Sequence, residues 1–509
     1  MLFNSIAFFA FFPIVTAIYF ALGRPSIASA RAQRWQWLWL LAASVYFYLA
    51  GPIPIYILIL VCTIVVDYAA GLLIENTQGQ PRRFWLILSI IVNIGALMLF
   101  KYVHFFTDQL GLSPLVREWM LTGLNATNTT VYASLGLPAQ TFTDLLLPVG
   151  LSFHTFQSLS YTFEVYYGRQ QAERNLGIFA LYVMFYPQLV AGPIERPQNL
   201  LSQFRAHHNF DYARVTDGLR LIAWGLFKKM VIADRLATLV NPVYNHPTQY
   251  QGIPLVLATF FFTWQIYCDF SGYSDIAIGS AKVMGFKLMD NFRAPYLARS
   301  ISDFWSRWHI SLSTWFRDYL YIPLGGNRVS AWRWQFNVFI VFLVSGFWHG
   351  ANWTFIVWGA LHGAYSIGEI WLRKLTRLYP PSLPQKWLSM LKWFSTFVLV
   401  ALAWVFFRAN HVGDGIYIVR HMFVGWSSLF TRAGRSIIWN GVGQPSEILL
   451  AFGLIALLWL IEATQPRLHW GEWLKRQPTW LRWSVYYAAV FSLLLLGRIG
   501  AEQFIYFQF

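Results

Sequence analysis

Residues Ser345–Gly363 read SGFWHGANWTFIVWGALHG, a stretch in which His349 and His362 are surrounded by aromatic, aliphatic and glycine residues. The stretch is apolar enough for a helix in a membrane or in a deep core, yet it carries two ionisable rings. Ionisable groups are costly in hydrocarbon, and those that face the interior of a helical bundle are candidates for a functional site. Whether the chain lies in a membrane is therefore the first point to settle.

The composition of the chain indicates an integral membrane protein. Of its 509 residues, 57% are hydrophobic and 12% charged, whereas roughly a quarter of the residues of soluble domains are charged. Apolar runs of roughly 17 to 25 residues, long enough to cross a bilayer as helices, recur along the whole sequence. We expect an all-α, polytopic membrane bundle of about ten to twelve spans, beginning with a retained first helix over Met1–Gly23.

The formal charge of +16 follows from short basic loops. Lys and Arg concentrate in residues 24–34, 78–83 and 372–377. Cytoplasmic loops of membrane proteins carry such an excess of Lys and Arg, so we expect these loops inside, the amino terminus outside, and no nucleic-acid partner.

Motifs of soluble enzymes and metal sites are absent from the sequence. There is no H-E-x-x-H, Walker, Rossmann or G-x-S-x-G pattern. Cys62 and Cys268 are too few for a disulfide framework or a thiolate metal site, and both lie in apolar runs. We therefore expect no metal ion and no bound cofactor.

Polar residues collect where the apolar runs are interrupted. Residues 146–168 carry His154, Gln157, Ser158, Ser160 and Glu164, and residues 267–279 carry Asp269 and Asp275. The two aspartates are six residues apart, so they do not share a helical face, and we expect them to form hydrogen bonds at a helix break. Irregular backbone at membrane depth is tolerated only inside protein or beside water, so these segments predict a buried, wet crevice.

The segment Ser302–Tyr321 has the pattern of one amphipathic helix lying in the interface plane or entering the bundle at a tilt. In such a helix His309 would be one turn from both Ser306 and Ser313, and a hydroxyl would satisfy its neutral ring. The spacing is equally consistent with a structural histidine and with a site histidine.

On a helix, His349 would share a face with Asn352, and Gly346 would let another backbone approach closely. A site role and a role in packing between helices both fit this pattern. His362 is thirteen residues further on and faces another side of an ideal helix, so we expect it to be structural.

Two stretches together resemble the membrane-bound O-acyltransferase (MBOAT) family, namely RWHISLSTWFRDYLYIPLGGNR (307–328) and GFWHGANWTFIVWGALHG (346–363). The likeness is to its bacterial branch, that of the membrane subunit for alginate O-acetylation. Further similar motifs are LPVGLSFHTFQSLSY, AGPIERPQNLLSQF, GLFKKMVIADRLA, YCDFSGYSDIAIGSAKVMGF and WVFFRAN. We expect a single MBOAT domain over residues 1–509, with N-terminal helices over 1–144, the most specific core over 145–410 and C-terminal helices over 411–509.

This resemblance implies a helical bundle around a central funnel, with His349 as the catalytic residue where cytoplasmic and external cavities meet. It places His309 in the active-site neighbourhood. Asn352, or a backbone amide near Gly350, is expected on helical spacing to orient the imidazole or to stabilise the tetrahedral oxyanion. A neutral imidazole either removes the proton of a sugar hydroxyl or holds the acyl group itself.

The resemblance also implies the substrates. The donor would be a cytoplasmic thioester, acetyl-CoA or an acyl carrier protein. The acetyl group would reach a periplasmic acetyltransferase partner and then a polysaccharide such as alginate, outside the bacterial inner membrane. Loops carrying Arg205, Arg214, Lys228, Lys229 and Arg235 would attract a phosphate-bearing donor, although membrane topology alone explains the same residues.

Two other functions stay open. One keeps the fold and changes the group or the acceptor, as in D-alanyl transfer to teichoic acid or O-acetylation of peptidoglycan. The other is a transporter or flippase that uses intramembrane His and Asp residues without acyl chemistry. The lack of a repeat of half the chain and the histidine motifs argue against the transporter.

Overall fold

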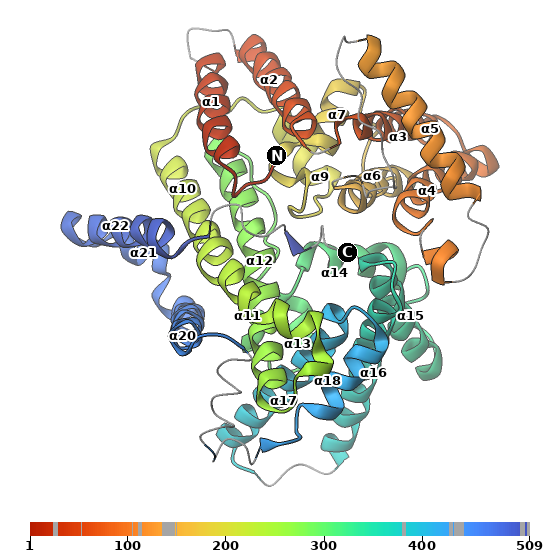
Figure 1. The fold of residues 1–509 in the computed structure, drawn as a ribbon. Coiled ribbons are helices and arrows are strands. Elements are labelled where there is room, and N and C mark those ends of the chain that lie inside the picture. The colour runs from red at the N-terminus through yellow and green to blue at the C-terminus, as the bar shows by residue number, and fades with distance from the viewer. Residues whose placement is uncertain are drawn as a thin grey trace. The chain divides into compact units, whose positions relative to one another are not determined.

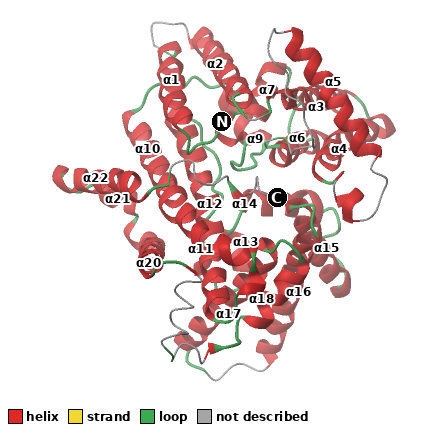
Figure 2. Ribbon diagram, viewed as in Figure 1, coloured by secondary structure: helices red, strands yellow, loops and turns green. Residues whose placement is uncertain are grey.

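The structure is a computed structural model, and it describes residues 1–23, 29–51, 53–103, 105–109, 115–134, 148, 150–378, 383–426, 431, 442–498 and 504–505. Every regular element within these ranges is a helix, and no strand is present among them (Figure 2). The all-α fold class expected from the sequence is confirmed.

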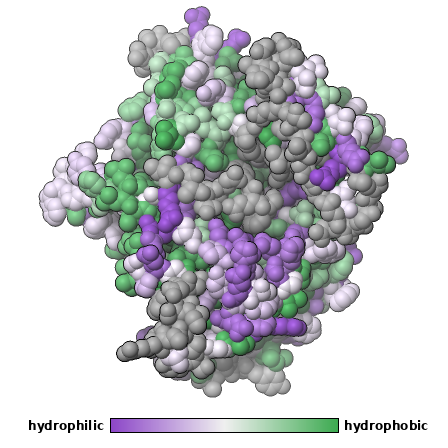
Figure 3. Space-filling model, in the orientation of Figure 1, coloured by the Kyte–Doolittle hydropathy of each residue, from purple (hydrophilic) through white to green (hydrophobic). Residues whose placement is uncertain are grey.

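Six helices of the described chain are long and apolar enough to cross a bilayer. They are Pro54–Asn76, Gly79–Lys101, Ile253–Met284, Gln385–Arg408, Pro445–Leu468 and Thr479–Leu496. The apolar runs of the sequence predicted more spans than these six, about ten to twelve. Some of the runs fold as shorter helices: α6 (Leu151–Tyr166) has 16 residues and α7 (Leu176–Met184) has 9. Apolar side chains are exposed along α1 (Ile6–Leu22), whereas hydrophilic ones gather over α13 (Ile301–Arg307) and α18 (Val412–His421) (Figure 3).

Contacts between helices divide the described chain into two compact units. The first comprises Met1–Val215 with Ser280–Leu288, and the second comprises Thr216–Gly279 with Met289–Phe509. The domain boundaries drawn from the sequence, and the central funnel, stay predictions.

The first unit contains α1, α2 (Ser29–Leu49), α3 (Ile57–Asn76), α4 (Gly79–Lys101), α5 (Leu115–Ser134), α6, α7, α8 (Tyr186–Leu189) and α9 (Pro197–Phe204) (Figure 1). Helices α3, α4 and α6 pack against one another around the buried carboxylate of Asp67. Ser89 Oγ donates to this carboxylate at 2.6 Å, Asn93 Nδ2 donates at 2.8 Å, and Ser158 Oγ also donates. These donors offset the cost of burying a carboxyl group within a membrane span.

The second unit contains most of α10 (Tyr212–Leu226), the π-helix Phe227–Ala233, α11 (Asp234–Asn245), most of α12 (Ile253–Met284), α13, α14 (Ile310–Phe316), the π-helix Arg317–Tyr321, α15 (Ala331–His349), α16 (Trp353–Leu378), α17 (Gln385–Arg408), α18, α20 (Pro445–Leu468), α21 (Trp470–Lys475) and α22 (Thr479–Leu496). Histidines 309, 349 and 362 all belong to this unit.

Helix α12 continues through Asp269 and Asp275, so the helix break expected there is wrong. The two carboxylates pair with lysines of the π-helix Phe227–Ala233. Lys228 Nζ lies 2.7 Å from Asp275 Oδ2, and Lys229 Nζ lies 2.5 Å from Asp269 Oδ1. Interior charges need such partners because desolvation is costly. The aspartates therefore fix the π-helix to α12.

The amphipathic pattern of Ser302–Tyr321 predicted one helix, and that prediction is wrong. Helix α13 ends at Arg307, α14 begins at Ile310, and a π-helix follows from Arg317 to Tyr321. The break falls at Trp308 and His309, and it removes the one-turn spacing on which the expected serine contacts depended.

Helices α15 and α16 form an antiparallel hairpin joined by residues 350–352 (Figure 1). Their backbones approach closely at glycines: a Cβ at Gly346 would lie 2.4 Å from the Phe355 carbonyl oxygen, and one at Gly359 would lie 2.4 Å from the Phe342 carbonyl oxygen. Small residues allow such an approach between membrane helices. This hairpin sets the position of the site described next.

Candidate active site

His349 is the last residue of α15. Gly350 follows in an extended conformation, with φ of −165°, and ends the helix. A Cβ at Gly350 would lie 2.1 Å from the Phe355 ring, so only glycine fits there. The imidazole therefore lies at the tip of the α15–α16 hairpin.

Three aromatic rings form a box around His349. The ring centroids of Trp348, Trp358 and Phe407 lie 4.8, 4.9 and 5.3 Å from the imidazole centroid, at angles of 69°, 88° and 71°. Such edge-to-face arrangements are favourable between aromatic rings. His349 is 3% exposed, so the aromatic box holds the ring and keeps water away from most of it.

The structure brings the two predicted site histidines, His309 and His349, to one indole. The centroid of Trp348 lies 6.3 Å from that of His309 and 4.8 Å from that of His349. His309 is fully buried and also contacts Phe270, with centroids 4.6 Å apart at 82°. Histidines forty residues apart in sequence thus share one aromatic neighbour.

His309 adopts a left-handed backbone conformation, with φ of 44° and ψ of 55°, immediately before α14. For a residue with a Cβ this conformation costs about 1–2 kcal/mol and persists only where its surroundings impose it. Asn291 supplies that support: its carbonyl oxygen accepts from Ile310 N at 3.0 Å, and its Oδ1 accepts from Ser311 Oγ at 2.9 Å. Asn291 Nδ2 in turn donates to Ser274 Oγ of α12 at 3.1 Å.

The hydroxyls of Ser306 and Ser313, which were expected to bond to the His309 ring, donate to backbone carbonyl oxygens. Ser306 Oγ donates to the Asp303 carbonyl oxygen at 2.7 Å, and Ser313 Oγ donates to the Trp308 carbonyl oxygen at 3.2 Å. Burial lowers the pKa of His309 from its ordinary 6.5 to about 3. The ring is therefore neutral at physiological pH.

Asn352 was expected to share a helical face with His349, and that expectation is wrong because α15 ends at His349. Its side chain caps α16 instead: Oδ1 accepts from Thr354 N at 3.0 Å, and Nδ2 donates to the Asn410 carbonyl oxygen at 2.9 Å. Its role in orienting the imidazole or stabilising an oxyanion therefore loses the spacing on which it was predicted.

His362 lies closer to the site than its distance in sequence indicated. Because the chain turns back after His349, the two histidines are on different helices, and the argument from a single helix is wrong. The centroid of His362 lies 5.0 Å from that of Trp358, the same indole that flanks His349 at 4.9 Å. His362 is fully buried.

The basic residues expected to attract a phosphate-bearing donor have local partners. Lys228 and Lys229 are buried in ion pairs with α12. Arg205 pairs with Glu173, which raises the pKa of the guanidinium, and Arg235 pairs with Glu447. Arg214 donates to the Asn209 carbonyl oxygen. Attraction of the donor by these residues stays a prediction. The ion pairs show Lys228, Lys229 and Arg235 linking their segments to neighbouring helices.

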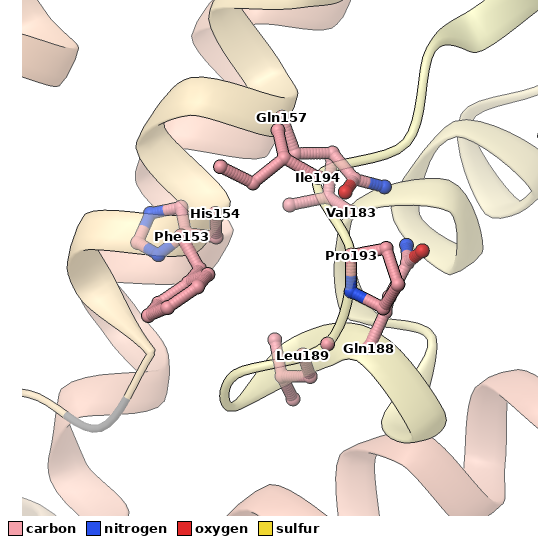
Figure 4. A pocket seen from close by; sticks show the side chains of 9 residues that line it. Phe153, His154, Gln157, Val183, Gln188, Leu189, Pro193 and Ile194 are labelled. Atoms are coloured by element: carbon pink, nitrogen blue, oxygen red, sulfur yellow. The ribbon is translucent and has the colours of Figure 1, made fainter. Parts of the chain in front are cut away.

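Two polar residues of segment 146–168, His154 and Gln157, border a pocket in the first unit (Figure 4). It is lined by Phe153, His154, Gln157, Val183, Gln188, Leu189, Gly192, Pro193 and Ile194, and it has no room for a water molecule. Gln157 and Gln188 both donate from Nε2 to the Tyr182 carbonyl oxygen, at 2.7 and 2.8 Å. These amides join α6 and α8 to the last turn of α7.

Sequence reasoning missed the residues that assemble the site. Trp348, Trp358 and Phe407 box in His349, and Asn291 supports the turn at His309. Two signals were available: Trp348 directly precedes His349 in sequence, and Trp358 and His362 are four residues apart, a spacing that places two residues together on a helix.

These features define a polytopic helical membrane protein whose core holds two buried imidazoles beside one indole. Residues 175–409, which include all three histidines, match the model of MBOAT, the membrane-bound O-acyltransferase family. The chain belongs to this family and is an O-acyltransferase.

Curated relatives of the chain carry out O-acetylation or D-alanylation. A probable alginate O-acetylase AlgI of Pseudomonas aeruginosa is 39% identical over 395 residues, which cover 76% of this chain and 70% of that protein. A peptidoglycan O-acetyltransferase of Helicobacter pylori is 37% identical over 391 residues, 71% of this chain and 69% of that protein. A teichoic acid D-alanyltransferase of Streptococcus thermophilus is 31% identical over 285 residues, 52% of this chain and 68% of that protein.

Proposed function

We propose that this O-acyltransferase passes acetyl groups from a thioester donor at the cytoplasmic face of the bacterial inner membrane to an extracellular polysaccharide such as alginate. The observation that carries the proposal is that the rings of His309 and His349 both contact the indole of Trp348. Both histidines lie within the residues that match the family model. The 38–40% identity to probable alginate O-acetylases over most of the chain supports acetyl as the acyl group and alginate as the class of acceptor.

The reaction needs a group that handles one proton. As the acceptor oxygen attacks the acyl carbonyl it loses its proton, and the departing thiolate of the donor gains one. His349 removes the proton of the acceptor, or it holds the acyl group until the acceptor arrives. The aromatic box excludes water from the imidazole, which protects an acyl group there from hydrolysis. His309, neutral through burial, serves as a hydrogen-bonding group beside the reaction.

The donor and the receiving protein follow from the family likeness. The thioester would be acetyl-CoA or an acyl carrier protein, and the acetyl group would pass to a periplasmic acetyltransferase partner before it reaches the polysaccharide. The chain itself would bind no cofactor, because the thioester is consumed as a substrate.

The test is the O-acetyl content of the surface polysaccharide, measured as acetate released by mild base. A deletion strain carrying His349→Ala should lose this acetate, whereas wild type and His246→Ala should restore it at equal membrane abundance. His246 is an exposed histidine of the same unit and serves as the matched control. Equal acetate with His349→Ala and wild type would contradict the proposal.

Peptidoglycan O-acetylation is the second candidate, because the Helicobacter pylori relative is 37% identical over 71% of this chain. D-alanyl transfer to teichoic acid has a shorter match, over 52% of the chain. The acceptors are separated by measuring ester-bound acetate in purified polysaccharide and in purified peptidoglycan of the same strains. The donors are separated by offering the purified protein a labelled acetyl thioester or a D-alanyl carrier protein. The transporter is not proposed, because the chain belongs to the O-acyltransferase family.

A further inference from the structure

Trp358 is shared by two buried histidines. Its ring centroid lies 4.9 Å from that of His349, at 88°, and 5.0 Å from that of His362, at 70°. Trp358 and His362 are four residues apart on α16, which places them on one face of the helix. The indole of Trp358 therefore connects the packing of His362 with that of His349.

The orientation of Trp358 depends on packing. Its Nε1 has no hydrogen-bond partner among the described residues. The ring stacks on Trp404 at 5.7 Å and 21°, and it meets Trp305 at 5.7 Å and 71° and Phe407 at 5.3 Å and 70°. No hydrogen bond therefore fixes the indole, and the surrounding rings set its orientation.

His362, in contrast, is fixed by a hydrogen bond from another helix. Trp305 Nε1 of α13 donates to His362 Nδ1 at 3.3 Å. An Nδ1 that accepts leaves the proton of a neutral imidazole on Nε2, so this bond selects the tautomer as well as the ring orientation. The Trp305 ring also packs against that of His362, with centroids 4.9 Å apart.

We propose that His362 is a positioning residue for His349. Fixed by Trp305, it holds the Trp358 indole in the orientation that seats the imidazole of His349. The inference rests on the proposed role of His349 in acyl transfer. In this proposal, residues of α13 and α16 fix the orientation of the imidazole at the end of α15.

Two substitutions of His362 separate positioning from filling of space. His362→Asn keeps an acceptor close to the position of Nδ1 but is smaller, whereas His362→Leu keeps the volume and loses the acceptor. We expect kcat of His362→Leu to fall on the order of ten- to a hundredfold, the loss typical of a misplaced reacting group, with KM within about twofold of wild type. His362→Asn should retain more kcat than His362→Leu.

Trp305→Phe tests the hydrogen bond from the other side, because it removes the Nε1 donor and keeps a smaller aromatic ring beside His362. It should lower kcat in the same direction, and with His362→Leu the two losses should not add. A purely packing role for His362 predicts the opposite order, with Leu better than Asn, and additive losses. Either of those results would overturn the proposal.

A readout without acyl transfer keeps the test independent of the proposed function. Carbethoxylation of His349 by diethyl pyrocarbonate, followed by peptide mass spectrometry on the purified protein, reports how tightly the ring is enclosed. The rate at His349 should rise in His362→Leu and Trp305→Phe at an unchanged melting temperature, and it should stay at the wild-type value in His246→Asn. An unchanged rate in all variants would reject positioning even if acetyl transfer is confirmed. A raised rate in a protein that transfers no acyl group would reject the proposed function alone.

Discussion

His309 combines two features that each oppose folding, a left-handed backbone and the full burial of a titratable ring. Asn291 and Ser311 tie down the turn on its carboxyl side, and Phe270 packs against the ring. A structure that maintains strain and burial at one residue is typical of a functional site. His349 shows the complementary arrangement, an ordinary helix end with the imidazole held by three aromatic rings.

The burial of His309 predicts a pH dependence of stability. Its pKa is about 3 in the folded protein and 6.5 ordinarily, so below pH 6.5 the unfolded chain binds a proton that the folded chain does not. The free energy of unfolding therefore falls as pH decreases, by about 2 kcal/mol from this residue between pH 6.5 and 5. His309→Asn, which tolerates the left-handed backbone, should show a shallower fall in urea unfolding of the purified protein. Equal slopes for variant and wild type would contradict the assignment.

At this scale the motifs allowed the histidines to be predicted, whereas their surroundings could not be. Trp348 and His349 are adjacent in sequence, but Phe407 and His309 reach the site from other segments of the chain. Contacts between distant segments depend on how helices pack, and no periodicity within one segment encodes them. Asn352 illustrates the error, because its predicted role assumed a helix that ends at His349.

The hairpin of α15 and α16 depends on the absence of side chains at its interface. Gly359→Ala would place a Cβ 2.4 Å from the Phe342 carbonyl oxygen, so the helices must separate. We expect it to lower the free energy of unfolding by about 1–3 kcal/mol, as overpacked cores do, and to reduce acyl transfer by moving His349. Gly368→Ala on the same helix meets nothing within 4 Å and should be neutral or stabilising by up to about 1 kcal/mol. Thermal unfolding of both variants checks the pair, and equal melting temperatures would count against the close approach.

Helix positions were predicted well where apolar runs are long and poorly where polar residues interrupt them. Among the apolar runs that recur along the sequence, the one over α17 forms an apolar helix of spanning length in the structure. The segment Ser302–Tyr321 kept its amphipathic pattern across a break that carries neither Pro nor Gly. Helix α12 continued through Asp269 and Asp275 because lysines elsewhere in the chain neutralise them.

At the scale of the whole molecule, a composition of 57% hydrophobic residues predicted a membrane protein, and the six apolar helices of spanning length among the described residues agree with that prediction. The direction of acyl transfer depends on which ends of these helices face the cytoplasm. The basic residues of the 78–83 segment predict, by the positive-inside rule, that the junction of α3 and α4 lies inside. The end of α2, across the span Pro54–Asn76, is then outside.

This orientation is tested with single cysteines at the two ends of one span. In a background with Cys62→Ala and Cys268→Ala, Leu49→Cys at the end of α2 and Gln80→Cys at the start of α4 each add one exposed thiol. A membrane-impermeant maleimide added to spheroplasts should label the cysteine at position 49 and leave that at position 80 unlabelled, whereas both should react after permeabilisation. The reverse pattern would place the basic segment outside. A cytoplasmic thioester would then meet the opposite face of the protein, and the proposed direction of acetyl transfer would be wrong.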